Sequence, residues 1–266
     1  NDGVAILDVR DPGQSRRTAL VETDEAAFDT TVEGNLAYVA GGADGLLIAD
    51  VTDPRAPQVL SKTAVGSSAQ GVCQQGTTVY LSTFKGELQA FDVQDPAHPL
   101  PLGHYRSGGQ GMGVACHGAV VYLSTPNQGL QVIDVSDPAT PEKVRTMPNT
   151  QGAWDIEVQG DTLFLGCHGN GLQIFDVTDP RAPRWVSAFA DGGEAYGVSA
   201  DGHYLYIADL QDGVEVWDVS DPRDPQKLDG DGQYAPHGIF HDGTYLYLAD
   251  QDQHFVVLAY DPGAAE

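Results

Sequence analysis

The pentapeptide D-V-x-D-P recurs at intervals of 42 residues, and this spacing constrains the fold more than any other feature of the chain. A short apolar segment stands before each copy, for example GLLIAD from Gly45 and GLQVID from Gly129. A fixed period of about 40–45 residues built from short strand patterns is typical of β-propeller blades and not of a mixed α/β domain. The second aspartate of the motif stands at Asp11, Asp53, Asp95, Asp137, Asp179 and Asp221, and a weaker echo is Asp261-Pro262.

Each repeat contains four apolar segments, which we name strands a to d. Strand a, such as AWDIEVQG from Ala153, ends in a glycine, as a tight hairpin with positive φ requires. Strand b carries an aromatic residue, strand c precedes D-V-x-D-P, and strand d is the less regular segment that follows it. Alternation with period two predicts strands almost everywhere. The hairpin glycines are Gly34, Gly76, Gly118, Gly160, Gly202 and Gly243, and the aromatic positions are Tyr38, Tyr80, Tyr122, Phe164, Tyr206 and Tyr247.

The aspartates of D-V-x-D-P are spaced closely enough to suggest metal chelation, but we favour a structural interpretation. An aspartate before proline accepts local backbone N–H bonds and starts a turn, while the proline fixes φ. A feature that every blade shares builds the blade more readily than it makes a unique site. We therefore expect Asp137→Ala to lower stability by about 1–2 kcal/mol without affecting any ligand.

The segments GLQVIDVSDPATP from Gly129 and GLQIFDVTDPRAP from Gly171 resemble the repeat of the LVIVD-repeat family of β-propellers. The resemblance extends over essentially the whole chain. It implies the propeller fold but little about activity, since such proteins look mostly like exported or surface-associated bacterial proteins of unassigned role. It carries over no catalytic residue.

We therefore expect an all-β chain that forms a single propeller domain over residues 1–266, with six four-stranded antiparallel blades. The c–d pair at residues 3–23 and the a–b–c set at residues 236–261 are expected to close the ring together. One c strand is then surplus, because GVAILD from Gly3 and FVVLAY from Phe255 cannot both pair with strand b. Two solutions stay open: Arg17–Thr23 alone supplies the missing d strand, or the C-terminal copy is displaced.

The formal net charge of -25, with only 13 basic residues, argues against nucleic acids and anionic membranes as partners. The same charge suits a well-solvated surface or a face that concentrates cations. No run approaches the roughly 18 apolar residues of a membrane span. The sequence starts at Asn1 without a leader, which fits a mature exported protein or a trimmed chain. We expect an extracellular or periplasmic protein.

The three cysteines do not suggest a disulfide framework. Cys73 and Cys116 fall on equivalent strands of consecutive repeats but are offset by one position. Their side chains are therefore expected on opposite faces, as small buried hydrophobic groups and not as a bridge.

Antiparallel alternation places the d–a and b–c loops on one face, where the repeats differ most. The position that opens strand a and the position near the end of strand b become aromatic or acidic in the last three repeats. We expect an exposed small-molecule or peptide site there, although large aromatic side chains also plug channel mouths. The candidate ligand-binding residues are Trp154, His168, Tyr196, Asp209, His237 and Asp250.

Two acidic segments on this face resemble parts of a calcium-binding loop. Asp229 and Asp231 alternate with glycines in a predicted d–a loop, and Asp250 and Asp252 alternate with glutamines in a b–c loop. Alternating carboxylates can wrap oxygen ligands around Ca²⁺, but no complete loop motif is present. A solvated acidic loop is the alternative interpretation, and we predict no other cofactor.

These features favour a non-catalytic binding or scaffold propeller, a monomer or a module of a larger assembly, that presents its variable face to a protein, peptide or glycan. A rival hypothesis is a hydrolase or lyase that uses His237 as acid or base, with Asp209 or Asp250 orienting it or holding a metal. The sequence has no G-x-S-x-G elbow, Walker loop or H-E-x-x-H motif that would favour catalysis.

Overall fold

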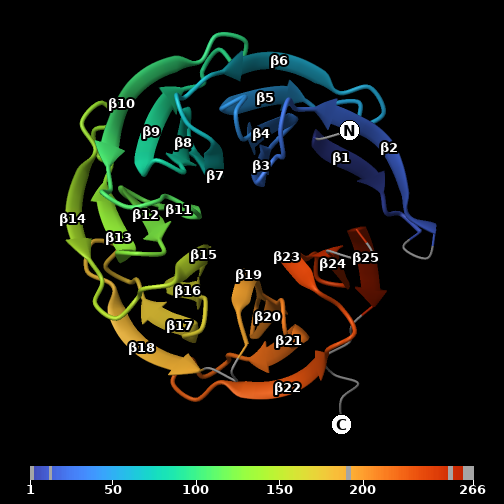
Figure 1. Cartoon of the computed structure of the whole chain (residues 1–266), viewed down its shortest axis with the longest axis vertical. Helices are drawn as coiled ribbons and strands as arrows, with labels where there is room; N and C mark the ends of the chain where they lie inside the picture. Colours follow the sequence, from blue (N-terminus) through green and yellow to red (C-terminus); the bar gives the residue numbers. More distant parts are fainter. Residues whose placement is uncertain (1–2, 12–13, 190–192, 251–253, 260–266) are drawn as a thin grey trace. The chain divides into compact units, whose positions relative to one another are not determined.

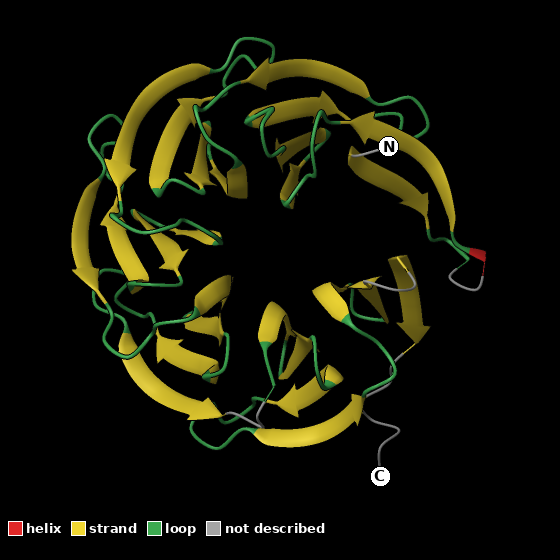
Figure 2. Cartoon of the chain, in the orientation of Figure 1, coloured by secondary structure: helices red, strands yellow, loops and turns green. Residues whose placement is uncertain are grey.

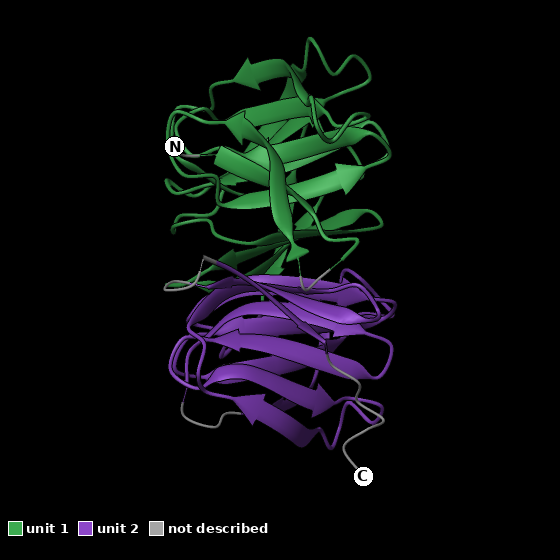
Figure 3. Cartoon of the chain, turned by 90° about the vertical axis from the view of Figure 1, so that its right-hand side faces the viewer, with its two compact units in different colours: residues 1–146 green, residues 147–266 purple. Residues whose placement is uncertain are grey.

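The computed structural model describes residues 3–11, 14–189, 193–250 and 254–259. These residues form strands joined by turns and loops; the short red segment of Figure 2 is a single 3-10 turn at Gln14, and no α-helix occurs among the described residues. The chain divides into two compact units, unit 1 (Asn1–Thr146) and unit 2 (Met147–Glu266), which Figure 3 colours separately. The prediction of one domain over residues 1–266 stays a prediction.

Unit 1 contains a two-stranded hairpin and three four-stranded antiparallel sheets. In each four-stranded sheet the strands follow chain order, so strand a forms one edge and strand d the other (Figure 1). The hairpin is β1 (Gly3–Asp8) and β2 (Arg16–Glu22). The sheets are β3 (Asp29–Glu33), β4 (Leu36–Ala40), β5 (Leu46–Asp50) and β6 (Gln58–Thr63); β7 (Ala69–Gln75), β8 (Thr78–Thr83), β9 (Glu87–Asp92) and β10 (Leu100–Arg106); and β11 (Val114–His117), β12 (Val120–Thr125), β13 (Gly129–Asp134) and β14 (Glu142–Thr146).

Unit 2 contains two more four-stranded sheets and one sheet with three described strands. Together with the sheets of unit 1, this order confirms the predicted fold class, an all-β, six-bladed propeller of antiparallel blades. The four-stranded sheets are β15 (Ala153–Gln159), β16 (Thr162–Cys167), β17 (Gly171–Asp176) and β18 (Arg184–Phe189); and β19 (Ala195–Asp201), β20 (Tyr204–Asp209), β21 (Gly213–Asp218) and β22 (Gln226–Asp231). The three-stranded sheet is β23 (Pro236–His241), β24 (Tyr245–Asp250) and β25 (His254–Ala259).

The a–b hairpins and the strand b aromatics behave as predicted. All six hairpin glycines have a φ between 57° and 94°, a region that side chains with a Cβ rarely enter. The aromatic residue of strand b is buried in each of the five four-stranded sheets, with Tyr122 and Tyr206 fully enclosed. The aromatic column is therefore core, and the glycines set the register of the sheets.

The D-V-x-D-P motif is a turn that its own side chains stabilise. In the copy after β13 the carboxylate of Asp134 accepts the amide of Ser136 at 3.0 Å, and that of Asp137 accepts the amide of Ala139 at 3.0 Å. The Val135 amide between them donates to the Ala119 carbonyl of the neighbouring a–b hairpin at 2.9 Å. The same three kinds of contact recur in the other four-stranded blades, which supports the structural interpretation of the motif.

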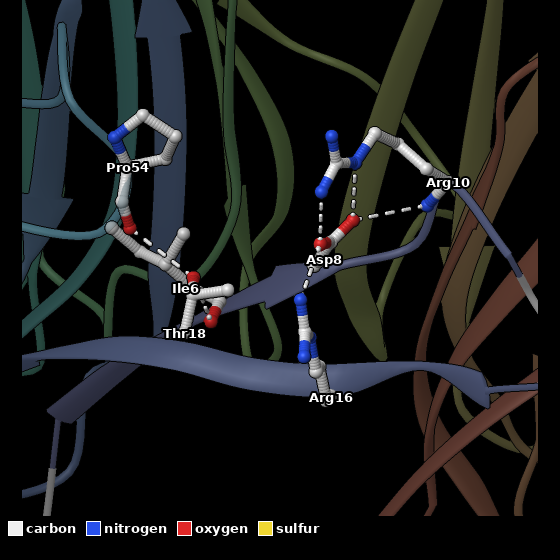
Figure 4. Close-up of polar contacts among 6 residues, drawn as sticks. All are labelled: Ile6, Asp8, Arg10, Arg16, Thr18 and Pro54. Carbon is white, nitrogen blue, oxygen red and sulfur yellow. Dashed lines mark hydrogen bonds and ion pairs between the residues drawn. The ribbon is translucent and has the colours of Figure 1, made fainter.

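Neighbouring blades are joined through these turns. The Ser61 hydroxyl on β6 donates to the Pro96 carbonyl of the next turn at 2.8 Å, and the Ser187 hydroxyl on β18 does the same to Pro222 at 2.5 Å. The Thr18 hydroxyl on β2 reaches the Pro54 carbonyl at 3.2 Å (Figure 4). The N-terminal hairpin therefore docks on its neighbour in the way that a strand d of a complete blade does.

The terminal strands settle one of the two open alternatives. β25 pairs with β24 along its whole length, from Tyr245↔Ala259 to Asp250↔His254. The C-terminal copy therefore takes the place of strand c, and the alternative in which it is displaced is wrong. β1 pairs with β2 in a separate sheet of unit 1. The predicted closure of the ring would pair the two ends of the chain, which belong to different units. It stays a prediction.

The prediction that Cys73 and Cys116 remain unbridged is wrong, because they form a disulfide with Cα atoms 5.8 Å apart. The one-residue offset does turn Cys116 to the opposite face of its own sheet. Successive blades, however, meet through opposite faces, so this offset brings the two side chains into the same space. The first two blades show a contact with the same separation of 43 residues: the Val72 amide donates to the Asp29 carboxylate at 2.8 Å.

Candidate functional site

Four of the predicted site residues form one aromatic cluster in unit 2: Trp154, His168, Tyr196 and His237. The Trp154 and His168 rings are stacked with centroids 4.4 Å apart and planes 13° from parallel. Tyr196 lies 4.0 Å from His168 and meets Trp154 edge-on at 5.4 Å. His237 extends the cluster through an edge contact with Tyr196 at 5.0 Å. The sequence prediction that these residues gather at one end of the blades agrees with this arrangement.

A bulge at the start of strand a places three of these rings. In β19 the ladder pairs Ala195 with Asp209 and Gly197 with Ala208, so Tyr196 has no opposite residue. Trp154 in β15 and His237 in β23 occupy the same interrupted position. A bulge takes a residue out of the ladder and redirects its side chain. The rings therefore project at the strand ends and do not enter the sheet cores.

His168 follows β16 directly and lies between Trp154 and Tyr196. Burial lowers the pKa of this imidazole, although the charges of Glu194 and Asp209 act in the opposite direction. Its Nε2 atom is buried, and no hydrogen-bond partner for it occurs in the described part of the chain. The ring is therefore neutral near pH 7 and leaves one polar atom unsatisfied inside the cluster.

Glu194 is a member of the site that the sequence did not single out. It stands in the loop before β19, and the pKa of Tyr196 is raised first by burial and then by the charge of this carboxylate. A carboxylate immediately before a predicted strand looks like any solvated loop charge. The available signal was its place two residues before the aromatic position of strand a.

The prediction that Asp209 and Asp250 are exposed is wrong. Only 2% of Asp209 and 5% of Asp250 is accessible to solvent. The Asp209 carboxylate accepts the amides of Gln211 and Asp212 at 2.8 and 2.9 Å, and that of Asp250 accepts the Ala235 amide at 2.7 Å. Carboxylates at the end of strand b therefore stabilise the surrounding loops, since a buried charge needs such donors.

The acidic segments do not have the predicted loop arrangement. Asp229 and Asp231 lie within strand β22, opposite Val216 and Val214, and not in a d–a loop. Asp252 lies outside the described residues. Among those that are described, no group of three or more His, Cys, Asp or Glu side chains is placed to hold a metal ion. Calcium binding by these aspartates and Asp250 stays a prediction.

The two carboxylates of the rival catalytic hypothesis already have backbone partners, and the hypothesis itself stays a prediction. His237 is exposed at the edge of the cluster, while the two carboxylates proposed to orient it bind backbone amides of their own blades. The Cys167 thiol near His168 is buried, and burial raises its pKa to about 12. This thiol therefore stays protonated and is a poor nucleophile near pH 7.

The repeat itself has a known counterpart. The model of the LVIVD repeat matches residues 26–63, 108–147, 152–191, 192–227 and 238–258. The chain belongs to the LVIVD repeat family. The matched segments include β15 to β18 and β19 to β21, which carry Trp154, His168 and Tyr196 of the aromatic cluster. No curated protein matches the sequence significantly.

Solved structures share the fold at low sequence identity. A chain of the mitotic checkpoint complex is 14% identical with a TM-score of 0.75, over 97% of this chain and 86% of that one. The Cps50 (Swd1) β-propeller domain of Myceliophteria thermophila is 12% identical with a TM-score of 0.76, over 92% and 86%. A functionally unknown protein of Desulfotomaculum acetoxidans is 12% identical with a TM-score of 0.67, over 80% and 75%. These similarities concern the fold alone.

Proposed function

We propose that this LVIVD protein is a non-catalytic binding or scaffold propeller that presents the loop face of unit 2 to a protein partner. The aromatic cluster is the observation that carries this proposal. Rigid aromatic side chains supply large contact areas at a low entropic cost and are enriched among the residues that dominate binding energy. The propeller fold commonly mediates protein interactions, which is consistent with this role.

Two features favour a contact surface over a plug that only fills space. His237 is exposed although its ring contacts Tyr196, so the cluster faces solvent on the side of His237. The buried Nε2 atom of His168 leaves hydrogen-bonding capacity that the described residues do not use. A buried polar atom without a hydrogen bond destabilises a purely structural core. Such atoms are expected at functional sites, where the cost in stability is accepted.

Export to an extracellular or periplasmic compartment is part of the proposal. The Cys73–Cys116 disulfide supports it, because disulfides persist in oxidising compartments and are rare in the cytosol of mesophiles. The acidic charge argues against nucleic acid as the partner. Within the described ranges, no helix has the length and apolar character that a membrane crossing requires.

The test compares partner binding by the wild type and by a Trp154→Ala/Tyr196→Ala variant. The protein is used as bait under native conditions, and bound proteins are identified by mass spectrometry and then confirmed with purified components. Trp185→Ala is the matched control, since Trp185 is 60% exposed but lies on strand d of the same blade. We expect the double variant to lose a partner that the control retains. If every partner binds both variants equally, this face is not the binding surface.

A further inference from the structure

We propose that the aromatic cluster binds a cationic side chain, a lysine or arginine presented by a partner protein, with Glu194 as its counter-charge. This inference rests on the proposed function and names the chemistry of the ligand. Three observations support it: the electron-rich rings, the carboxylates that act on them, and the placement of the basic residues of unit 2.

The rings form a neutral platform of the kind that attracts cations. A cation within about 6 Å of an aromatic face is attracted by the ring quadrupole, and tryptophan is the strongest of the natural rings. Trp154 and Tyr196 are only partly buried, and His237 is exposed. Since burial keeps His168 neutral, the ring between Trp154 and Tyr196 does not repel an incoming cation near pH 7.

Two carboxylates place a negative field on this platform. The charge of Glu194 adds to the effect of burial in raising the Tyr196 pKa, and the charges of Glu194 and Asp209 oppose the effect of burial on the His168 pKa. Asp209 is buried and already occupied by loop amides, whereas Glu194 is partly exposed. Glu194 is therefore the carboxylate available to a ligand, and Asp209 adds its charge to the field.

Within unit 2, the sequence places no lysine or arginine in the loops or strands that carry the cluster. Unit 2 has 21 acidic and 4 basic residues. Arg181 and Arg223 lie in c–d turns, Arg184 opens strand d of β18, and Lys227 on β22 pairs with Glu215. All four belong to turns or strands that follow strand c, so none stands in a d–a loop, a b–c loop or strand a.

Charge complementarity separates this ligand from other candidates. An acidic peptide or a phosphate group meets repulsion from Glu194 and from the net charge of the unit. A neutral sugar stacks on the rings but gains nothing from the carboxylate. A lysine or arginine side chain uses both features, so its binding is expected to fall as salt screens Glu194.

The experiment is a titration with a tetralysine amide peptide, followed by the indole N–H resonances of ¹⁵N-labelled protein at low salt. The chain has three tryptophans, and Trp185 and Trp217 are internal references on strands d and c. We expect a saturable shift of the Trp154 resonance alone. The control peptide has the same length with all lysine amines, including the amino terminus, acetylated, and it should leave that resonance unchanged.

Substitutions then test the two components separately. Trp154→Ala and Glu194→Gln should each weaken tetralysine binding by about tenfold, within the range of one cation–π or one partly desolvated charge contact. Glu142→Gln removes the same charge from an exposed site on β14 and should leave the dissociation constant unchanged. Melting curves of all variants confirm that each one is folded.

Three outcomes would overturn the cation inference: tetralysine does not shift Trp154, Glu194→Gln binds as tightly as Glu142→Gln, or the acetylated peptide binds equally well. If the acetylated peptide or chitotriose shifts Trp154 independently of salt, the face binds a neutral ligand. The proposed function then stands without the cation. If no partner depends on Trp154 and Tyr196 in the bait experiment, the proposed function fails as well.

Discussion

Units 1 and 2 are built from the same repeat but differ in charge and in the residues at the start of strand a. Unit 1 has 17 acidic and 9 basic residues, a formal charge of -8, whereas unit 2 has 21 and 4, a charge of -17. The opening position of strand a in unit 1 is Gln70 or Met112 in two blades, where the side chain is buried, and the 54% exposed Phe28 in the third. In unit 2 the same position carries the partly exposed rings of Trp154 and Tyr196.

The two units also differ where strand a contacts the next blade. In unit 1 the Cys73–Cys116 disulfide occupies this contact. The equivalent positions in unit 2 are Glu157 and Ala200, and burial, reinforced by the charge of Asp155, raises the Glu157 pKa to about 7. The turns and hairpins that define the blade are common to both units. The same contact of strand a therefore affects the stability of the two units differently. A disulfide stabilises it in unit 1, whereas a buried carboxyl destabilises it in unit 2.

The largest expected effect on stability comes from removing the Cys73–Cys116 disulfide of unit 1. A disulfide closing a loop of 43 residues constrains the unfolded chain by about 4 kcal/mol in the chain-entropy model. We expect Cys73→Ala/Cys116→Ala to lower the free energy of unfolding by roughly 2–4 kcal/mol. Chemical denaturation of the wild type and the variant measures this loss.

Reductant provides the control for this prediction. It should destabilise the wild type to nearly the level of the variant and leave the variant itself unaffected. If the variant and the wild type unfold at the same denaturant concentration without reductant, the disulfide does not stabilise unit 1.

The next effect concerns the buried carboxyl of unit 2. Because folding raises the Glu157 pKa from 4.5 to about 7, the folded state binds the proton more tightly than the unfolded chain. Stability from this group is complete below pH 4.5 and is lost as the pH rises toward 7. Glu157→Gln should therefore stabilise the protein at pH 8 by about 1–3 kcal/mol and have little effect at pH 4.

Melting temperatures at the two pH values measure this difference, with the exposed Glu142→Gln as control. An equal shift at pH 4 and pH 8 would contradict a titrating origin. It would indicate that the amide changes packing or hydrogen bonding and not the cost of burying a charge.

A third prediction tests what the units share. Asp137→Ala in unit 1 and Asp179→Ala in unit 2 remove the same turn contacts, to Ala139 and Arg181 at 3.0 and 3.1 Å. Each should lower the stability by about 1–2 kcal/mol, and neither should change ligand binding. A variant that keeps its melting temperature but loses a bound ion would show that the motif is a metal site.

The repeated positions were predictable because their physical roles are local. Each hairpin glycine needs positive φ, and each D-V-x-D-P aspartate accepts amides within its own turn, so the sequence of one blade contains the whole explanation. The disulfide was not predictable by the same reasoning. Its geometry depends on which faces two separate sheets present to each other, and alternation within one strand does not contain that information.

The candidate site was predictable in part for the same reason. The contrast between repeats identified Trp154, His168, Tyr196 and His237, which the bulge of strand a and the end of strand b do bring together. Burial of Asp209 was missed because it depends on the folding of the adjacent b–c loop around the carboxylate. Sequence contrast thus finds unusual side chains, but only the structure distinguishes those that face solvent from those that hold a loop.

The smallest expected effect belongs to His168, the ring at the centre of the aromatic cluster. Because burial lowers its pKa, the unfolded chain takes up a proton before the folded protein does as the pH falls. Stability therefore decreases as the pH falls through the ordinary titration range of histidine, near 6.5. His168→Phe keeps a ring between Trp154 and Tyr196 but cannot titrate. Its melting temperature should fall less than that of the wild type between about pH 7 and pH 5, since the contribution of His168 is absent while Glu157 titrates alike in both proteins. The same variant sharpens the comparison of the units: protonated His168 repels a cation, so acidification should weaken tetralysine binding less in His168→Phe than in the wild type. Identical pH profiles of stability for the two proteins would show that the cluster does not hold His168 neutral.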